Sequence, residues 1–535
     1  MTIVPFLAVA FGAGALSLLT RRSTLVSGVI GIGGLLLAAL VAMGIDADDT
    51  MAVGGGELVG SAYLRLFVVL GSIVALILAI LGFATTTHRH APGVLLAGIG
   101  AAGLALALPD ARIAVLAASA GGLIGILVTV MTPATARSVV VASRELRAIA
   151  VAGVLAILAT AWIGRSLGEL ATEPAVFGMA YLGFAAAVAI RFGAIPFHFW
   201  AARLADAAPE VTLPMLMAWS PAAFAVVALA WADQSVAPLV LPLSAERGLI
   251  LAVGAVSIVL GAVAAWIQDD LEHVVGYLII ADAGVAILGL AALQPEAWEP
   301  ARTWVLSFVV VRSAFAAWAV ALRAAFGTRR IPDLRGWAIR APGLGVAFVV
   351  IAVAGIAWPG LASWNARATL IDLTLDGPFY LLVTLGALAP IAVYGRLAMV
   401  GLARPAERLG AGFVERPALP ASVAVKGRGA DAVRAVTATA LEVGRLNRVL
   451  VASVLVGVLA VLSFTVSAGG LGVVDAARAV PQQVPRPTDG PVSPSPSSGE
   501  SAAPTDAPST APTEEPSAEA SAAPPSFQPL PSASP

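Results

Sequence analysis

Apolar runs of close to 20 residues follow one another through residues 3–467 and constrain the fold more than any other feature. A helix of about 20 apolar residues spans the hydrocarbon core of a bilayer. β-Barrel strands would alternate in polarity over about ten residues, and these runs do not alternate. The sequence therefore predicts an all-α integral membrane protein with about 14 transmembrane helices. The runs lie at about 3–20, 25–44, 63–83, 92–108, 111–131, 147–164, 175–197, 211–232, 247–267, 274–294, 302–324, 341–361, 377–400 and 448–467.

The composition of the 535-residue chain agrees with a lipid environment, because 59% of its residues are hydrophobic and only 12% are charged. Soluble domains are about a quarter charged. The chain has no cysteine, which excludes disulfides and thiolate metal ligands. Its four histidines are not spaced as metal ligands, and its net charge of −1 gives no sign of a nucleic-acid partner. We therefore expect no metal, no cofactor and no nucleic acid, with the lipid bilayer as the main surroundings.

Positive charge alternates from one loop to the next. Arginines follow the odd-numbered runs, whereas the loops after even-numbered runs are acidic or nearly neutral. By the positive-inside rule the odd loops are cytoplasmic. We therefore expect a multi-pass protein of the cell (plasma) membrane with both termini extracytoplasmic. One odd loop departs from this pattern, because residues 269–273 after the ninth run are mainly acidic and lack arginine.

Residues 191–200 interrupt the seventh run with three residues that do not belong in lipid, Arg191, Pro196 and His198. The arginine must face protein or water, because its charge costs several kcal/mol in hydrocarbon. The proline breaks the helix, which is tolerated where the freed backbone groups line a cavity. This pattern is typical of an ion or substrate pathway. The alternative is a kinked helix with a snorkelling arginine.

The twelfth run repeats this arrangement, with Pro359 and Gly360 followed by Arg367. Two broken helices five runs apart predict two five-helix repeats, runs 4–8 and 9–13, each holding one broken helix. The repeats are inverted relative to each other because each contains an odd number of spans. The predicted parts of the chain are three N-terminal helices at 1–91, the repeats at 92–232 and 247–400, a cytoplasmic loop at 401–447, a last helix at 448–467 and a disordered acidic Pro/Ser/Ala-rich tail at 480–535.

Few other ionisable residues lie within the runs. Asp282 in the tenth run and Arg312 in the eleventh can form a buried ion pair. His198 has a side chain that titrates near neutral pH, and its Pro-Phe-His setting favours a backbone hydrogen bond that holds the broken helix. A structural ion pair is one interpretation of Asp282 and Arg312. An internal water chain through Asp282 and His198 is the other.

Three stretches of the chain resemble the antiporter-like membrane subunits of respiratory complex I, a family shared with Mrp-type cation/proton antiporters and membrane-bound hydrogenases. The stretches are residues 191–200 with their Pro-Phe-His-Phe-Trp sequence, residues 268–284, and residues 333–367 with Asp-Leu-Arg-Gly and the Pro-Gly break. The resemblance covers about 92–400, and the quinone-proximal N-type subunit is the most similar. It implies the fourteen-helix fold and an association with proton or cation translocation.

The resemblance also implies where protons are carried: a glutamate in span 5, lysines in spans 7 and 8, and a lysine or glutamate in span 12. In this chain Arg191 and Arg367 occupy the span-7 and span-12 positions. Span 5 has Ala120 or Gly121 where the glutamate is expected, and Ser220 stands near the span-8 lysine position. A guanidinium keeps its proton at any accessible pH, unlike a buried lysine. The usual relay is therefore replaced.

These observations favour a divergent antiporter-like subunit of a complex I-like (NADH:quinone oxidoreductase) or Mrp-type assembly, packed against sister membrane subunits, with weakened or absent ion translocation. A second hypothesis is a working transporter in which arginines act as fixed charges while His198, Asp282 or water moves the proton. A third is a membrane scaffold or assembly protein without ion transport. The sequence contains no catalytic triad, phosphate loop or redox-ligand set, so the chain is at most a non-catalytic subunit of an oxidoreductase.

Removal of residues 481–535 should leave membrane insertion and folding unchanged, because this segment is too polar and too rich in Pro and Ser to contribute to a core. The measurement compares membrane expression and thermal stability of the full chain with those of a chain ending at residue 480. Loss of the shortened chain from the membrane fraction would contradict this prediction.

Overall fold

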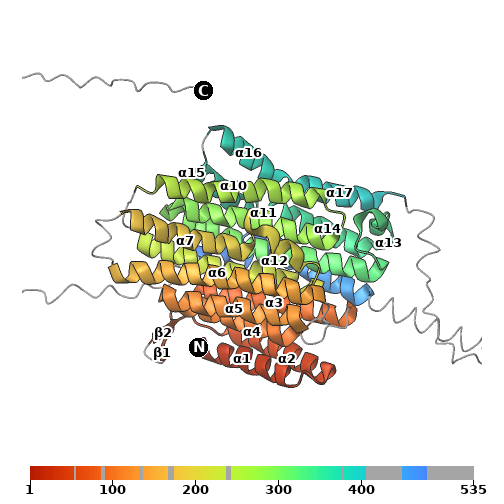
Figure 1. Ribbon diagram of the computed structural model, residues 1–535. Coiled ribbons are helices and arrows are strands. Elements are labelled where there is room, and N and C mark those ends of the chain that lie inside the picture. Colours follow the sequence, from red (N-terminus) through yellow and green to blue (C-terminus); the bar gives the residue numbers. More distant parts are fainter. Residues whose placement is uncertain are drawn as a thin grey trace, which may run out of the picture. The chain divides into compact units, whose positions relative to one another are not determined.

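Long apolar helices make up nearly all of the protein in its computed structural model (Figure 1). The structure describes residues 1–53, 56–85, 91–131, 136–166, 174–236, 242–375, 377–404 and 449–478. Nearly all of the predicted cytoplasmic loop, and all of the predicted tail, lie outside the described residues. The prediction of a helical integral membrane protein is confirmed.

The N-terminal part of the chain forms long helices and one short hairpin. The helices are α1 (Val4–Leu19), α2 (Thr24–Met43), α3 (Ala62–Thr85), α4 (Ala91–Ala107), α5 (Ala111–Met131), α6 (Ala136–Ser166) and α7 (Pro174–Phe192). The hairpin joins α2 to α3. It pairs β1 (Thr50–Val53) with β2 (Gly56–Val59) in antiparallel register, with Thr50 opposite Val59.

The rest of the chain alternates short and long helices. Short elements follow α7: η2 (Phe197–Phe199), α8 (Ala201–Leu204), η3 (Glu210–Thr212), η4 (Met215–Trp219), α9 (Ser220–Trp231) and η5 (Ala232–Val236). Next come α10 (Ser244–Ile267), α11 (Leu271–Ala292), α12 (Pro295–Phe326), η7 (Ile331–Leu334), α13 (Trp337–Arg340), α14 (Pro342–Gly355), α15 (Ala362–Thr374), α16 (Gly377–Leu388) and α17 (Pro390–Leu402). A helix at Val449–Ser467, η8 (Gly470–Gly472) and α20 (Val473–Arg478) complete the described chain.

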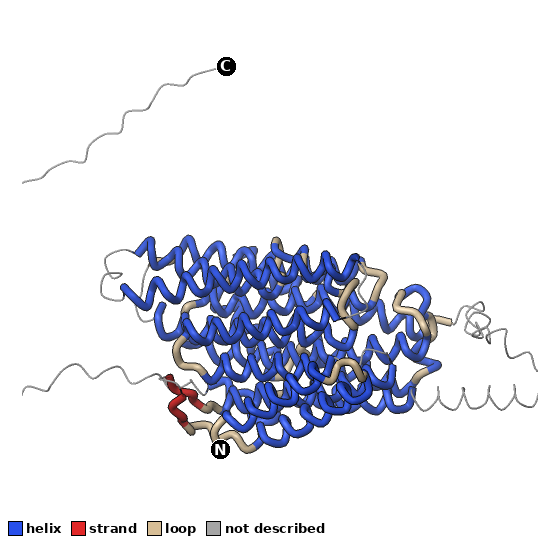
Figure 2. The backbone as a smooth tube through the Cα atoms, turned by 60° about the horizontal axis from the view of Figure 1, so that its bottom comes forward, coloured by secondary structure: helices blue, strands red, loops and turns tan. Residues whose placement is uncertain are grey.

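The long helices lie side by side with their axes close to parallel, as the two views in Figures 1 and 2 show. Eleven helical segments of the described chain are long and apolar enough to cross a membrane, and three shorter apolar helices accompany them. The helices α11 and α12 are central, with 94% and 100% of their apolar windows buried, whereas α10 has 39% buried. The protein is thus a multi-pass membrane protein with a central layer of enclosed helices.

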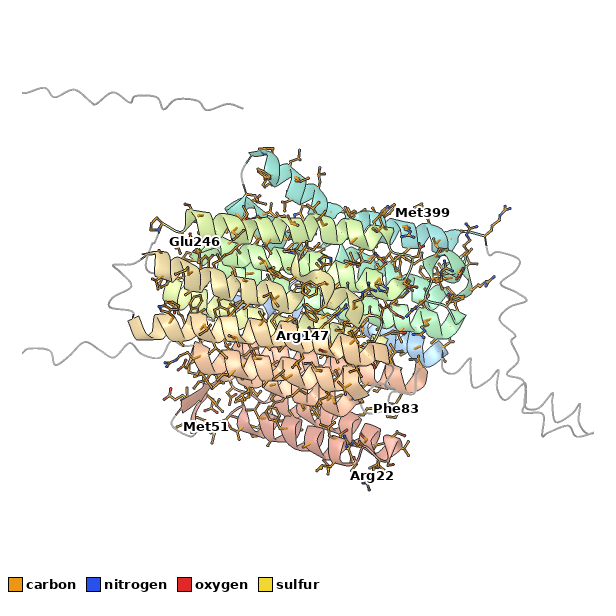
Figure 3. The ribbon with its side chains drawn as sticks, viewed as in Figure 1. Arg22, Met51, Phe83, Arg147, Glu246 and Met399 are labelled. Atoms are coloured by element: carbon orange, nitrogen blue, oxygen red, sulfur yellow. The ribbon has the colours of Figure 1, made fainter. Side chains whose placement is uncertain are left out.

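The outer helices present apolar side chains outward. Leu249 and Ile267 of α10 are 53% and 66% exposed, and Met399 of α17 is 65% exposed (Figure 3). A water-soluble protein of this kind would carry polar side chains at these positions, whereas lipid accepts apolar ones. The exposed apolar faces therefore mark the surface that meets the membrane.

The first helix break begins at a glycine and not at the proline expected from the sequence. The helix α7 ends at Phe192, and Gly193 adopts a left-handed conformation with φ of +63°. Glycine adopts this conformation without steric cost, so the helix has already ended three residues before Pro196. The turn is held by a hydrogen bond from Ala194 N to Ala189 O of 2.8 Å.

The second break separates α14 from α15. The helix α14 ends at Gly355, and α15 begins at Ala362. Between them Ala357 and Gly360 have positive φ angles of 51° and 96°. Pro359 and Gly360 thus lie within a non-helical connection between two short helices, and the second of these, α15, begins just after the predicted run 341–361.

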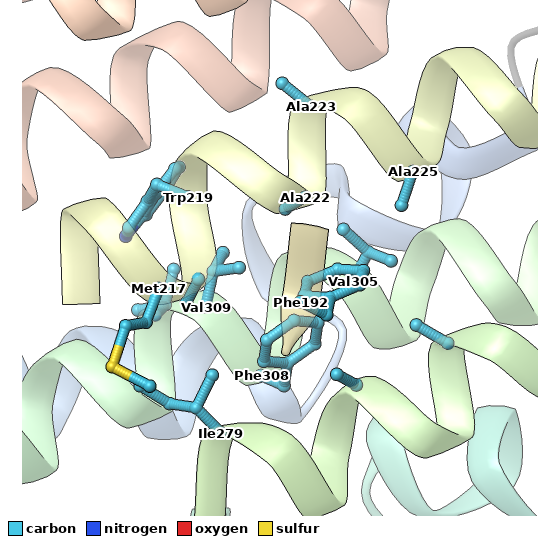
Figure 4. Close-up of a cluster of buried hydrophobic side chains, with 14 of the residues drawn as sticks. Phe192, Met217, Trp219, Ala222, Ala223, Ala225, Ile279, Val305, Phe308 and Val309 are labelled. Atoms are coloured by element: carbon cyan, nitrogen blue, oxygen red, sulfur yellow. The ribbon is translucent and has the colours of Figure 1, made fainter. Parts of the chain in front are cut away.

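A packed apolar core lies beside the first break. Phe192, the last residue of α7, packs against Phe308 of α12 with ring centroids 5.9 Å apart, and Figure 4 shows both rings among side chains of α9, α11 and α12. Trp219 Nε1 donates to Ser313 Oγ at 3.0 Å, which ties the η4 turn to α12. This core fixes the end of α7 relative to the central helices.

The helix α6 is longer than the apolar run that predicted it. The run was expected at 147–164, but α6 spans Ala136–Ser166. Charged residues at 144, 145 and 147 lower the local hydropathy, so hydropathy alone places the boundary too late. The extension brings Glu145, which the sequence analysis had treated as part of a loop, into the bundle.

Candidate functional site

Arg191 lies in the last turn of α7 and is only 2% exposed. Its Nη2 donates to Ser220 Oγ at 2.7 Å, while its Nε has no hydrogen-bond partner among the described residues. Ser220 is the first residue of α9 and follows the π-helical turn η4. Such turns are frequent at functional sites because they locally change the direction in which side chains point.

A glycine on α5 makes room for this guanidinium. A Cβ atom at Gly122 would lie 2.6 Å from Arg191 Nη2 and 2.8 Å from Cζ. No real Cβ approaches so closely, so the arginine occupies the volume that a side chain at position 122 would fill. The small residues of α5 therefore accommodate the arginine. Gly121 beside it carries no side chain, and it is one of the two positions, with Ala120, where the resemblance had implied a glutamate.

Glu145 supplies the carboxylate of this site from α6. Its side chain is buried, with the residue 3% exposed, and Thr129 Oγ1 donates to Glu145 Oε2 at 3.2 Å. Glu145, Arg191 and Ser220 line one cavity of about 30 Å³ whose other walls are apolar or glycine. A cavity of roughly 10–15 Å³ by the same kind of measure admits one water when polar partners are present. The cavity therefore has room for about two waters between an acid, a guanidinium and a hydroxyl.

Sequence reasoning missed Glu145 because exposed arginines flank it. On α6 the residues Arg144 and Arg147 are exposed, whereas Glu145 shares a buried stripe with Ala142, Ile149 and Ala152. Spacings of three and four residues place these positions on one helical face. That periodicity was the available signal, and a hydropathy average over the segment hides it.

Asp282 and Arg312 form a buried ion pair between α11 and α12. Arg312 Nε lies 2.5 Å from Asp282 Oδ2, and Arg312 Nη2 lies 3.0 Å from Asp282 Oδ1. Arg312 Nη1 also donates to the hydroxyl of Tyr394 at 2.6 Å. The pair that the sequence suggested is therefore present, in the two-pronged geometry that suits guanidinium and carboxylate. Arg312 is fully buried and Asp282 is 6% exposed.

Arg367 lies in α15, just after the second break, and is 4% exposed. Its Nη1 donates to Ala387 O at 3.1 Å, and its guanidinium lies over the rings of Trp364 and Trp304 at 5.2 and 5.8 Å from their centroids. Among the residues that the structure describes, no carboxylate oxygen lies within 4.0 Å of it. Two arginines thus surround Asp282, and only one of them is bonded to it.

His198 lies apart from both sites. It belongs to the short η2 element, is half-buried, and does not line the cavity of Glu145 and Arg191. Its buried Nδ1 has no hydrogen-bond partner among the described residues, so the expected backbone bond is not made by this atom. The break is held by other contacts. Trp200 Nε1 donates to Ile190 O at 2.9 Å, and Ile195 N donates to Ser257 Oγ at 3.0 Å.

The acidic loop that departed from the charge alternation is paired with arginines from later in the chain. Arg329 Nη1 lies 2.7 Å from Glu272 Oε2, and Arg396 Nη2 lies 2.8 Å from Asp269 Oδ1. Backbone bonds join the same segments, with Ile331 N donating to Asp269 O at 2.7 Å. The acidic loop therefore lies at the arginine-bearing end of the bundle, which explains the exception.

No group of three or more His, Cys, Asp or Glu side chains within the described ranges has a geometry that could hold a metal ion.

Comparisons with known proteins agree with this architecture. A family model described as "NADH:quinone oxidoreductase/Mrp antiporter, TM" matches residues 112–391. NADH-quinone oxidoreductase subunit N 2 of Solidesulfovibrio magneticus is 30% identical over 227 residues, which are 42% of this chain and 47% of the relative. Subunit M of Mycobacterium tuberculosis is 29% identical over 236 residues, covering 43% and 41%. The chain thus matches less than half the length of these relatives.

Solved structures share the fold at lower sequence identity. A chain of respiratory complex I from Thermus thermophilus superposes with a TM-score of 0.61 at 19% identity, covering 86% of this chain and 98% of that one. A chain of the Mrp complex from Dietzia sp. gives a TM-score of 0.68 at 18% identity, covering 89% and 52%. Both neighbours are subunits of multi-subunit membrane complexes.

Asp282→Asn should destabilise the protein by about 3–5 kcal/mol, because it leaves the buried Arg312 without its counter-ion. The matched control is Asp269→Asn, which makes the same change in an exposed pair. The side chain of Asp269 is 58% exposed beside Arg396, so its loss should cost only about 0.2–1 kcal/mol. Unfolding in a mixed-micelle denaturant titration measures both. Equal small losses would show that the buried pair is not needed for stability.

Proposed function

Because the chain belongs to the NADH:quinone oxidoreductase/Mrp antiporter transmembrane family, we propose that it is a divergent antiporter-like membrane subunit of a complex I-like or Mrp-type assembly. Its interior charges differ from the lysine and glutamate relay that the family resemblance implies. One observation carries the proposal: a buried Arg191 bonded to Ser220 shares a cavity with Glu145 beside the first helix break.

The topology belongs to the same proposal. Fourteen membrane spans include two inverted repeats at 92–232 and 247–400, and both termini lie outside the cytoplasm in the cell (plasma) membrane. Described helices overlap every predicted run, and each repeat contains one interrupted helix with a buried arginine beside the break. The pairing of the acidic ninth loop with Arg329 and Arg396 supports the assignment of that end to the cytoplasm.

In the first repeat, Glu145 is the group that binds and releases a proton. Arg191 cannot act as the relay, because a guanidinium keeps its proton, but its fixed charge stabilises the carboxylate across the cavity. Water in the cavity would connect Glu145 with Ser220 and Arg191. Glu145 belongs to α6, but its side chain lines the same cavity that a glutamate on α5 would reach.

The second repeat is different, because both oxygens of Asp282 accept hydrogen bonds from Arg312. A carboxylate held in this way is a structural counter-ion and not a free proton carrier. Any ion movement by this chain therefore depends on the first repeat. Because the Asp282 carboxylate is held by Arg312, the second repeat also favours the second candidate function, a membrane scaffold or assembly protein without ion transport.

Proton flux separates these functions. Proteoliposomes of the purified full chain with an internal pH-sensitive dye should show flux that Glu145→Gln removes, because the amide cannot take up a proton. Glu57→Gln is the matched control on the exposed hairpin and should leave the flux unchanged. Equal flux in the wild type and Glu145→Gln would reject Glu145 as the carrier. Absence of flux in the wild type would favour the scaffold.

Membership of an assembly is tested separately. After mild detergent extraction, the chain should migrate on a native gel at the mass of a multi-subunit complex and should co-purify with other membrane subunits of an oxidoreductase or antiporter. A harsher detergent that dissociates subunits provides the control, because it should shift the chain to the mass of a single polypeptide. Migration as a single polypeptide in both detergents would contradict the proposal.

A further inference from the structure

A second cavity lies between α15 and α16 and contains a buried arginine. It has a volume of about 70 Å³, and Trp364, Arg367, Ala368, Tyr380 and Thr384 are among the residues that line it. Arg367 is 96% shielded from solvent, since only 4% of it is exposed. Its Nη2 has no hydrogen-bond partner in the described part of the chain. The cavity therefore holds an unused cationic donor.

The buried charges near this cavity do not balance. Asp372 interacts with Tyr380, which lines the cavity, but Asp372 is exposed and does not offset a buried charge. Arg312 and Arg367 both lie near Asp282, but the two oxygens of Asp282 are engaged by Arg312. One buried positive charge is left over. In the first repeat the corresponding excess does not arise, because Glu145 faces the cavity of Arg191. An arginine charge without a counter-ion is costly at membrane depth, so a bound anion would stabilise Arg367.

Three contacts hold the guanidinium without neutralising it. The carbonyl oxygen of Ala387 accepts from Nη1 at 3.1 Å, and the rings of Trp364 and Trp304 lie 5.2 and 5.8 Å from the guanidinium carbon. Cation–π contacts restrict the orientation of the guanidinium plane. The arginine is thus pre-oriented, and Nη2 remains available for an acceptor.

The cavity reaches the membrane-facing surface at α16. Tyr380 is 39% exposed, and its neighbours Phe379 and Leu381 are 66% and 61% exposed. Thr384, one turn further along α16, also lines the cavity. An occupant can therefore place a polar head beside Arg367 while an apolar chain lies along the exposed side chains of α16.

We propose that Arg367 is an anion-binding site that accepts an oxyanion, the phosphate or carboxylate of a membrane amphiphile or of a free anion, through its Nη2. Bidentate or single charge-assisted bonds from arginine to such oxygens are strong in a low-dielectric setting. The site does not depend on proton transport or on assembly partners. It follows from the charge imbalance, the unpartnered nitrogen and the opening at α16.

The test uses the purified full chain in nanodiscs. In phosphatidylcholine with one part in five of phosphatidylglycerol, the wild-type Tm should exceed that in phosphatidylcholine alone by about 2 °C or more, because ligand binding stabilises the folded state. A second arm keeps phosphatidylcholine alone and exchanges chloride, which is not an oxyanion, for inorganic phosphate at constant ionic strength. A rise only in the first arm assigns the site to a lipid headgroup, and a rise in the second assigns it to a free anion.

Substitutions at three positions test whether the rise in Tm comes from Arg367 and its cavity. Arg367→Gln should abolish the Tm rise. The matched control is Arg396→Gln, which removes an arginine that also lies over a tryptophan but is already paired with Asp269 at 2.8 Å, and which should retain the rise. Ala368→Leu fills the cavity and keeps the arginine, so it decides the question if Arg367→Gln does not fold.

A direct readout complements the Tm. Phosphatidylglycerol brominated on its acyl chains should quench tryptophan fluorescence more strongly in the wild type than in Trp364→Phe or Ala368→Leu. No rise in Tm with either anion source, or an unchanged response in both Arg367→Gln and Ala368→Leu, would overturn the site.

Discussion

The need to balance charge inside the membrane governs the interior of this protein. Lipid offers no water to solvate an arginine, so a buried arginine is stabilised by groups that other helices supply. Arg312 meets Asp282, and Arg191 shares its cavity with Glu145. The ion pair ties α12 to α11, and the bond of Arg191 to Ser220 ties α7 to α9. The arrangement of the central helices thus depends on where opposite charges can meet.

Two of the buried arginines, Arg191 and Arg367, lie beside interruptions in their helices. The chain leaves the helix at Gly193 and at 356–361. Arg191 lies within one turn of the first interruption, and Arg367 lies within two turns of the second. The breaks differ in detail, since one begins at a left-handed glycine and the other includes Pro359 and Gly360. Aromatic packing of Phe192 on Phe308 then fixes the first break against α12. Packing and charge therefore act on the same residues.

This chain has the fold of its family, but its interior side chains differ from those that the resemblance implies. The fold is shared with subunits of complex I and Mrp complexes, but Arg191 stands where the resemblance implied a lysine and Arg367 where it implied a lysine or a glutamate. A fold constrains helices and their spacing, whereas function depends on which side chains face the interior. In the first site the carboxylate comes from Glu145 of α6, and in the second both oxygens of Asp282 are bonded to Arg312.

Local features of the sequence determined the helical membrane fold and the two interrupted runs, because hydropathy and glycine and proline placement act over short stretches, and the buried charges offered the pairing of Asp282 with Arg312 as one of two interpretations. The sequence did not place Glu145 in the interior, since exposed arginines on both sides hid its helical face. It also placed the first break at Pro196, because glycine's role at position 193 depends on the turn that follows. Only the tertiary structure decided that Glu145 shares a cavity with Arg191 and that Arg367 of α15 has no carboxylate partner among the described residues, because these outcomes depend on how the faces of separate helices pack.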